Sequence, residues 1–352
     1  MNRIIVLILL CFFLHQNTFS QTPASDPHWK INWEDNFDFF DPLKWIKQDY
    51  LTDDGPQLYL QSNVWVENSN LVLRLNNTRT KNIITGNWHD YTSGDIHSSS
   101  AYPIKYGYLE ARIKFPFKEG KIWGFWPAFW TTLGYNVINP TSAAEIDICE
   151  IFGGEDNSNL QIGTCLHRCY SGWYTPYFPS PCNNGDMGQG HTISSSYTNW
   201  HTYAIEWDVN RITWYIDGKA IRTTVKHLIV DPIRIILNLA IQGQKKYHPP
   251  TSPPFEEKMY VDYVKVYSLK CDKNTVVTQI PNFNTYNYAV KKSISLSNTT
   301  TIPAGSNITL RANDFIELKP GFEVQTDREL YLDVSPCSNS SIIYKPYDPN
   351  RN

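Results

Sequence analysis

The chain has 352 residues, a formal net charge of −3 at pH 7, 18% charged residues and 14% aromatic residues. This length is too great for one typical domain and suits a large β-sandwich plus a small module. The lack of a basic run excludes a nucleic-acid partner, and nothing beyond the N-terminus predicts a membrane span. The 12 Trp and 22 Tyr are suited to stacking on sugar rings.

Residues 1–20 predict a signal peptide. Arg3 supplies the positive charge, residues 4–14 form an apolar run too short to span a bilayer as a mature helix, and the small Ser20 ends the segment. Cys11 falls inside this segment, which leaves six cysteines in the mature chain. We therefore expect a secreted protein, outside the cell or at its surface, in which cysteine oxidation is the default.

Short strands separated by turn residues follow and predict an all-β fold. Leucines alternate from residue 71 to 75, and Asp217-Gly218 separates two strands at a turn that requires positive φ. Residues 233–241 are almost all apolar, as expected for a central strand covered on both faces. No long segment has a helical period. Two packed antiparallel sheets are the expected architecture.

The run from Glu145 to Glu150, Glu-Ile-Asp-Ile-Cys-Glu, crowds three carboxylates into one predicted strand. In a regular strand Glu145 and Asp147 share a face, and Glu150 points away from it. A β-bulge would add one residue and return Glu150 to that face. The glutamate Cα atoms would then lie about 13 Å apart, and their side chains could approach the roughly 5–5.5 Å of a retaining glycosidase. An acidic edge strand facing water is the alternative.

These carboxyl groups can divide the work of cleaving a glycosidic bond. One glutamate must be ionised to attack the anomeric carbon, and the other must hold a proton for the leaving oxygen. Asp147 can hydrogen-bond the attacking group, and its negative charge raises the pKa of its neighbours.

Residues 106–114 (YGYLEARIK), residues 124–130 (GFWPAFW) and the acidic run resemble, in order and spacing, glycoside hydrolase family 16. The resemblance covers about residues 28–268, and the E-x-D-x-x-E form is similar to the branch with laminarinases, agarases and carrageenases. It implies a curved, concanavalin-like jelly roll whose concave face is the cleft, and a reaction without a cofactor. It also implies three catalytic roles: Glu145 as nucleophile, Asp147 as its helper and Glu150 as acid/base.

Two aromatic residues before the acidic run, Trp126 and Trp130, would share one strand face and offer a platform for sugar rings, although core packing is the alternative. The resemblance also implies cleft positions for His167 and Asn238, either of which can instead be structural. It further implies a possible structural calcium at Asp262, completed by backbone carbonyls near Glu34.

The expected substrate is a β-1,3- or β-1,3/1,4-glucan, cleaved by an endo-acting monomer. The loop at residues 171–199 is unusually aromatic for the family and leaves algal galactans (agar, porphyran or carrageenan) open. A non-catalytic glycan-binding protein on the same fold is the alternative from another functional class.

Beyond the sandwich, residues 269–337 predict a small β module, because apolar residues recur at even positions: Ile308, Leu310, Ile316, Leu318, Phe322, Val324, Leu330, Leu332 and Val334. Its run at residues 315–322 (FIELKPGF) resembles the stacked-hairpin module of secreted bacterial proteins that is sometimes called a three-coathanger stack. Residues 338–352 form a polar tail. The expected disulfides are Cys169 with Cys182, within the loop, and Cys271 with Cys337, around the module.

Overall fold

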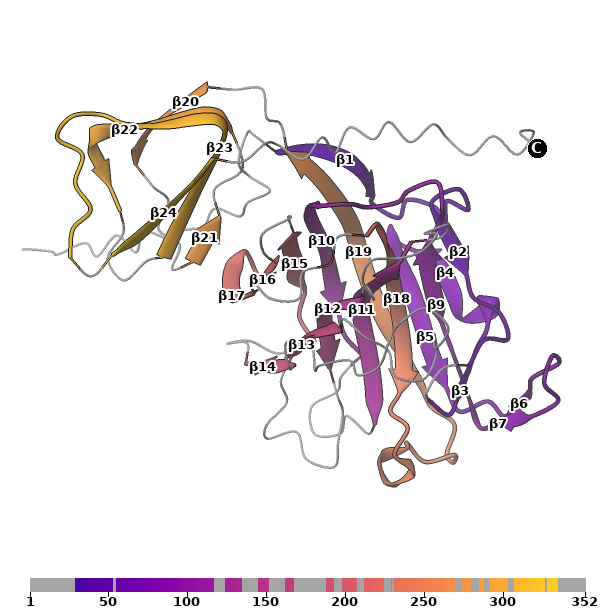
Figure 1. The fold of residues 1–352 in the computed structure, drawn as a ribbon. Helices are drawn as coiled ribbons and strands as arrows, with labels where there is room; N and C mark the ends of the chain where they lie inside the picture. The colour runs from indigo at the N-terminus through magenta and orange to yellow at the C-terminus, as the bar shows by residue number, and fades with distance from the viewer. Residues whose placement is uncertain are drawn as a thin grey trace, which may run out of the picture.

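The structure is a computed structural model that describes residues 29–52, 55–116, 124–134, 145–151, 162–167, 188–192, 198–207, 212–224, 229, 231–269, 274–279, 285–287, 291–302, 307–326 and 328–334. Over these ranges the chain is built almost entirely of strands (Figure 1), which confirms the all-β prediction. The helices in this part are the short 3-10 turns η2 (Gln61–Asn63) and η3 (Lys245–Tyr247). No helix there is long and apolar enough to cross a membrane.

Two large sheets form the sandwich. The ten-stranded sheet runs in the order β17 (Lys219–Thr224), β16 (Ile212–Ile216), β15 (His201–Trp207), β10 (Gly107–Lys114), β19 (Glu256–Leu269), β5 (Asn70–Asn76), β8 (Tyr91–Ser93) and β3 (Gln57–Tyr59), with β1 (Trp29–Asp35) beside β19 and β4 (Val64–Glu67) beside β5. The seven-stranded sheet runs β14 (Gln189–His191), β13 (Ile162–His167), β12 (Glu145–Ile151), β11 (Phe125–Leu133), β18 (Ile233–Ile241), β9 (Asp95–Ser98) and β2 (Trp45–Lys47). A separate hairpin pairs β6 (Thr80–Lys81) with β7 (Trp88–His89).

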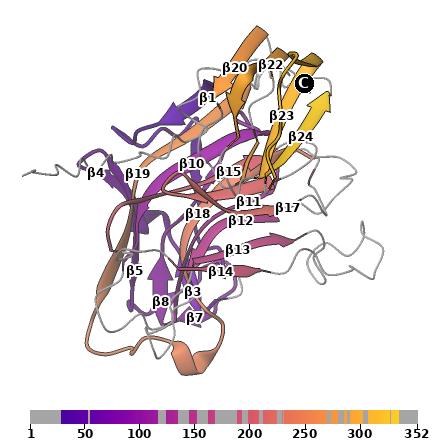
Figure 2. The same cartoon turned by 90° about the vertical axis from the view of Figure 1, so that its left-hand side faces the viewer.

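The two sheets pack face to face around one apolar core (Figure 2). Strand alternation explains which residues enter it: Phe125 and Phe129 of β11 are in the core, while Trp126 and Trp130 point to the opposite face of the sheet. The same alternation along β18 buries its odd-numbered residues in the core. The strand predicted at 233–241 is therefore central, lying between β11 and β9.

The predicted turn at Asp217-Gly218 joins β16 to β17. Both residues have positive φ, 48° and 73°, as a two-residue hairpin turn requires. This turn returns the chain along the edge of the ten-stranded sheet as β17, in which Arg222 and Thr224 are buried.

The C-terminal strands form their own five-stranded sheet: β20 (Asn274–Gln279), β21 (Thr285–Asn287), β22 (Lys291–Thr301), β23 (Asn307–Leu318) and β24 (Glu329–Val334). Ser293 pairs with Phe315, and Asn307 pairs with Glu329, each 22 positions further along. All the pairings among these described strands are parallel, so they stack as rungs, and the expected stacked hairpins are not what pairs them. A small apolar core holds them together, made of Ile294, Leu296, Ile302, Leu310 and Ala312.

Candidate active site

The acidic strand β12 contains the predicted β-bulge. Against β13, Asp147 pairs with Cys165 and Glu150 with Gly163, so three steps on β12 match two on its neighbour. Against β11 the register also shifts, between Phe129 and Trp130. The extra residue lets the apolar side chains of β12 stay in the core, while Glu145, Asp147 and Glu150 share the other face.

Two tryptophans of β11 hydrogen-bond to the strands on either side, one to β12 and one to β18. The Trp126 indole Nε1 donates to Glu150 Oε1 at 2.8 Å, and Trp130 Nε1 donates to Asn238 Oδ1 at 3.0 Å. Both rings are half-buried and lie outside the core cluster. Ala128 lies between them, opposite Glu150 on one side and Asn238 on the other. The predicted residues of β11, β12 and β18 therefore meet on one sheet face.

Asn238 links this face to the ten-stranded sheet. Its Nδ2 donates to the Tyr59 hydroxyl at 2.8 Å, and that hydroxyl also accepts from Gln57 Nε2 at 3.2 Å. All three side chains are buried. The amide of Asn238 is thus fixed by donors and acceptors on both sides, which holds the Trp130 indole in place.

Asp147 is the most deeply buried of the three carboxylates, with 2% of its surface exposed, against 7% for Glu145. Burial, followed by the charge of Glu145, raises the pKa of Asp147 well above its usual range, while its hydrogen bond with Glu150 and the charge of Arg222 oppose the rise. Asp147 therefore holds a proton at pH values where an exposed aspartate is ionised.

Sequence reasoning missed Arg222, a buried residue of β17. Its Nη1 donates to the Thr164 carbonyl oxygen at 2.6 Å and to Thr164 Oγ1 at 3.0 Å. Its guanidinium carbon lies 4.4 Å from the centroid of the Trp214 ring, and Trp214 Nε1 donates to the Asp147 carbonyl oxygen at 2.9 Å. Trp214 and Arg222 are paired across one hairpin, but the contacts of Arg222 with Thr164 and of Trp214 with Asp147 join strands far apart in the sequence, so no local pattern signals them.

A second missed pair lies on β9. Asp95 and His97 flank the core residue Ile96, and their side chains approach to 3.1 Å between Asp95 Oδ1 and His97 Nε2. In the β9–β18 register Asp95 is opposite Asn238. Since residues paired across a sheet share a face, the pair extends the polar face of the site beyond Asn238.

The other predicted residues on β13 are placed only in part. His167 lies opposite Glu145 in the β12–β13 register, but its side chain is outside the described residues. Cys165 is a free cysteine, as is Cys149 in the core. The four cysteines of the two expected disulfides, Cys169, Cys182, Cys271 and Cys337, and most of the 171–199 loop also lie outside the described residues.

The atoms assigned to the calcium site contact cations. Asp262 Oδ2 accepts from Arg112 Nη1 at 2.6 Å, and the Glu34 carbonyl oxygen accepts from Lys44 Nζ at 2.7 Å. In the part of the chain that is described, no group of three or more His, Cys, Asp or Glu could hold a metal ion. A calcium ion at these atoms would have to replace two positive side chains, so the residues present do not fit it.

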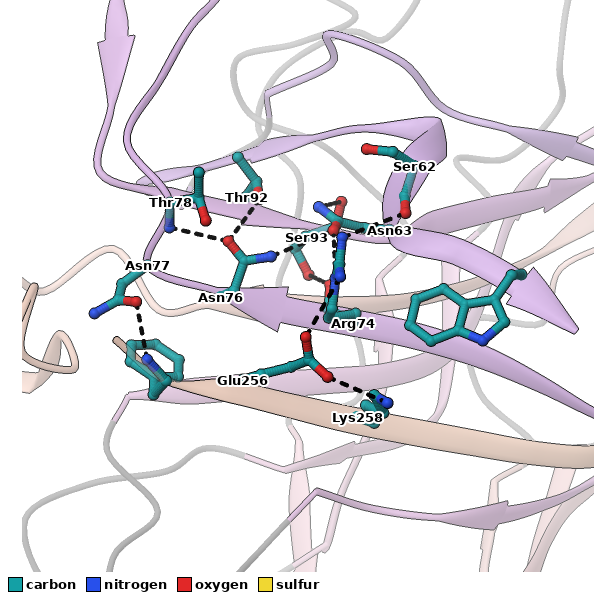
Figure 3. Close-up of polar contacts among 12 residues, drawn as sticks. Ser62, Asn63, Arg74, Asn76, Asn77, Thr78, Thr92, Ser93, Glu256 and Lys258 are labelled. Atoms are coloured by element: carbon teal, nitrogen blue, oxygen red, sulfur yellow. Dashed lines mark hydrogen bonds and ion pairs between the residues drawn. The ribbon is translucent and has the colours of Figure 1, made fainter. Parts of the chain in front are cut away.

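A network of polar side chains lies around β5 of the ten-stranded sheet (Figure 3). Arg74 Nε donates to Asn63 Oδ1 at 2.8 Å, and its Nη1 lies 3.4 Å from Glu256 Oε2. Although burial opposes the change, Lys258 and Arg74 lower the pKa of Glu256. Ser93 adds a link between the sheets, because its hydroxyl contacts carbonyl oxygens of Arg74 and of Leu239 on β18. The network therefore supports the strand that carries Asn238.

The fold and the site together define a class: jelly-roll β-sandwiches with a strand that carries three carboxylates on one sheet face. Residues 53–246 match the Glycosyl hydrolases family 16 model, and the chain belongs to this family.

Two curated relatives and one solved structure illustrate the similarity. Endo-1,3-1,4-beta-glycanase EglC of Rhizobium meliloti (strain 1021) is 31% identical over 188 residues, 53% of this chain and 35% of that protein. Glucan endo-1,3-beta-glucosidase A1 of Niallia circulans is 27% identical over 266 residues, 67% of this chain and 37% of that protein. The match thus spans about a third of these relatives. The catalytic domain of an endo-1,3-beta-glucanase (laminarinase) from Thermotoga petrophila RKU-1 aligns with TM-score 0.56 and 25% identity, covering 69% of this chain and 98% of that one.

Proposed function

We propose that this chain is a retaining endo-glycoside hydrolase that cleaves a β-1,3- or mixed β-1,3/1,4-glucan. The observation that carries the proposal is the bulge in β12, which returns Glu150 to the face of Glu145 and Asp147. Without it, one of the two glutamates needed for a double displacement would point into the core.

In the proposed reaction, a Glu145 carboxylate oxygen attacks the anomeric carbon while Glu150 gives a proton to the departing glycosidic oxygen. Glu150 then takes a proton from water, and that water releases the sugar from Glu145. Burial and the charge of Glu145 raise the pKa of Asp147, which favours keeping a proton in the hydrogen-bonded pair of Asp147 and Glu150 before attack. The Trp126 N–H donor fixes the orientation of Glu150. No catalytic cofactor is part of these steps.

The proposed substrate follows from the relatives. EglC is named an endo-1,3-1,4-beta-glycanase, the Niallia circulans protein a glucan endo-1,3-beta-glucosidase, and the Thermotoga petrophila structure is a laminarinase domain. Trp126 and Trp130 are half-buried on the acidic face and leave ring surface for a flat sugar. His167, opposite Glu145, is proposed as a further cleft residue.

A galactan is the second candidate. The keratan-sulfate endo-1,4-beta-galactosidase of Sphingobacterium multivorum is 26% identical over 280 residues, 72% of this chain and 58% of that protein. This match is longer than the one to EglC. In either case we propose that the enzyme is exported through residues 1–20, acts as a monomer, and carries a three-coathanger-like module after its catalytic domain.

The test is product analysis of residues 21–352 against laminarin, mixed-linkage glucan, agarose, porphyran, κ-carrageenan and keratan sulfate. Oligosaccharides from laminarin or mixed-linkage glucan, absent with Glu145→Gln and Glu150→Gln, are the expected result. Products from a galactan alone would show that the substrate is a galactan and not a glucan. Binding without cleavage by the wild type would favour a glycan-binding protein, and full activity in either variant would refute the catalytic assignment.

A further inference from the structure

Arg222 is a positive charge enclosed between the two sheets. Only 6% of its surface is exposed, and it lies on β17, at one edge of the ten-stranded sheet. Both of its contacts with Thr164 reach β13, in the other sheet, and both are to neutral oxygen atoms. Burying a guanidinium is costly, and the cost is offset where negative charge lies nearby.

The contacts of Arg222 lead to both sides of the β12 bulge. Thr164 lies between Gly163 and Cys165, the two β13 residues that pair with Glu150 and Asp147. On its other side Arg222 stacks on Trp214, whose indole donates to the Asp147 backbone. The Arg222 side chain therefore contacts both Thr164, beside the bulge, and Trp214, which hydrogen-bonds the backbone of the bulged strand.

The titratable groups named near Arg222 come from two strands, β12 and β14. Glu145, Asp147 and Glu150 of β12 supply negative charge on the cleft face, and the neighbouring Cys149 thiol is held in its neutral form because burial raises its pKa. His191 of β14 contacts Thr164 Oγ1 at 3.1 Å through Nε2. Burial first, and then the charge of Arg222, lowers the pKa of His191, which favours the neutral imidazole. Among these described groups, Arg222 is thus the positive charge at neutral pH.

We propose that Arg222 is a positioning residue for the proposed hydrolysis, which holds the bulge in register and sets by its fixed charge the number of protons on the three carboxylates. The inference rests on the proposed function. Three carboxylates on one face repel one another and tend to take up protons. A permanent cation behind the strand opposes this, so that Glu145 stays ionised while one proton remains for transfer.

The test compares Arg222→Gln, which can still donate to Thr164 but is neutral, with Arg222→Lys, which keeps the charge. Arg112→Met is the matched control, because Arg112 also lies on the ten-stranded sheet, hydrogen-bonds Asp262 and stacks on an indole, that of Trp200. The measurements are the pH profile of kcat/KM and the unfolding midpoint as a function of pH.

In Arg222→Gln both limbs of the profile are expected to move upward by about one pH unit, as for a unit charge removed at several ångströms, with KM at the optimum within about twofold of wild type. Arg222→Lys and Arg112→Met should keep the wild-type profile. Arg222→Met, a second neutral variant, should shift like Arg222→Gln.

A wild-type profile in the neutral variants, even with lower stability, would overturn the inference, as would an equal shift in Arg222→Lys. If the wild type cleaves no polymer, the proposed function fails on its own. The unfolding data then decide the inference. A carboxyl group with a raised pKa makes the folded protein less stable as pH rises through that pKa. In Arg222→Gln this loss of stability should continue to a pH about one unit higher than in wild type and in Arg112→Met.

Discussion

Replacing Trp126 with Phe removes one hydrogen bond to Glu150 and keeps an aromatic ring on the cleft face. The bond is 2.8 Å long and half-buried, and a hydrogen bond to a charged group contributes roughly 1.5–3 kcal/mol. Because the N–H donor favours the ionised carboxylate, its loss should raise the pKa of Glu150 by about one to two units. The alkaline limb of the kcat/KM profile, which reports loss of the acid's proton, should move upward by that amount.

Trp130→Phe is the control for this substitution. Trp130 lies on the same strand face and is equally half-buried, but its indole donates to Asn238 and not to a carboxylate. Its variant should therefore lose affinity or stability without moving the alkaline limb. Superimposable profiles for Trp126→Phe and wild type would show that the Trp126 bond does not control the proton on Glu150, and equal shifts in the two variants would show that ring shape is responsible.

Three further outcomes are expected. The stability that Asp147 supplies is complete below the ordinary carboxyl pKa of 3.8 and is lost as pH rises through its raised pKa. The unfolding midpoint of Asp147→Asn should therefore rise relative to that of wild type as pH increases from 4 to neutrality. A difference that does not change with pH would contradict this. Asn238→Ala removes two hydrogen bonds, one from the half-buried Trp130 indole and one to the buried Tyr59 hydroxyl, and should cost about 2 kcal/mol in unfolding free energy, measurable by denaturant titration. A loss indistinguishable from zero would show that Asn238 does not stabilise this part of the sheet. Cys271→Ser or Cys337→Ser should destabilise the module by about 4 kcal/mol if the pair closes a loop of some 65 residues, and peptide mapping without reductant should find the two joined; two free thiols would remove the disulfide.

The sequence was most informative where the signal is local. The bulge in β12 follows from three carboxylates at spacings that a regular strand cannot place on one face, and the structure confirms it. The turn at Asp217-Gly218 was readable because positive φ favours these two residues. The tryptophans of β11 were placed on the correct face, but their donor role required the positions of partners on neighbouring strands.

Long-range pairing explains what the sequence did not reveal. Asp95 and His97 sit two residues apart in a strand, which predicts a shared face, but only the pairing of β9 with β18, about 140 residues away, shows that this face belongs to the site. Arg222 acts across the sandwich on a strand almost 60 residues earlier. In the C-terminal module, apolar alternation identified strands, yet alternation is the same for parallel and antiparallel pairing.

The extra residue in β12 also has a consequence for how the site can be gained or lost during evolution. Side chains in a strand alternate, so removing a single residue between Asp147 and Glu150 would leave the three carboxylates at alternate positions, on one face of a regular strand without a bulge. A change elsewhere in β12 that kept all three acids but straightened the bulge would instead turn Glu150 toward the apolar interior. For chains of this family, the spacing of the carboxylates must therefore match the presence or absence of a bulge, and the identity of the acidic residues alone does not establish hydrolysis.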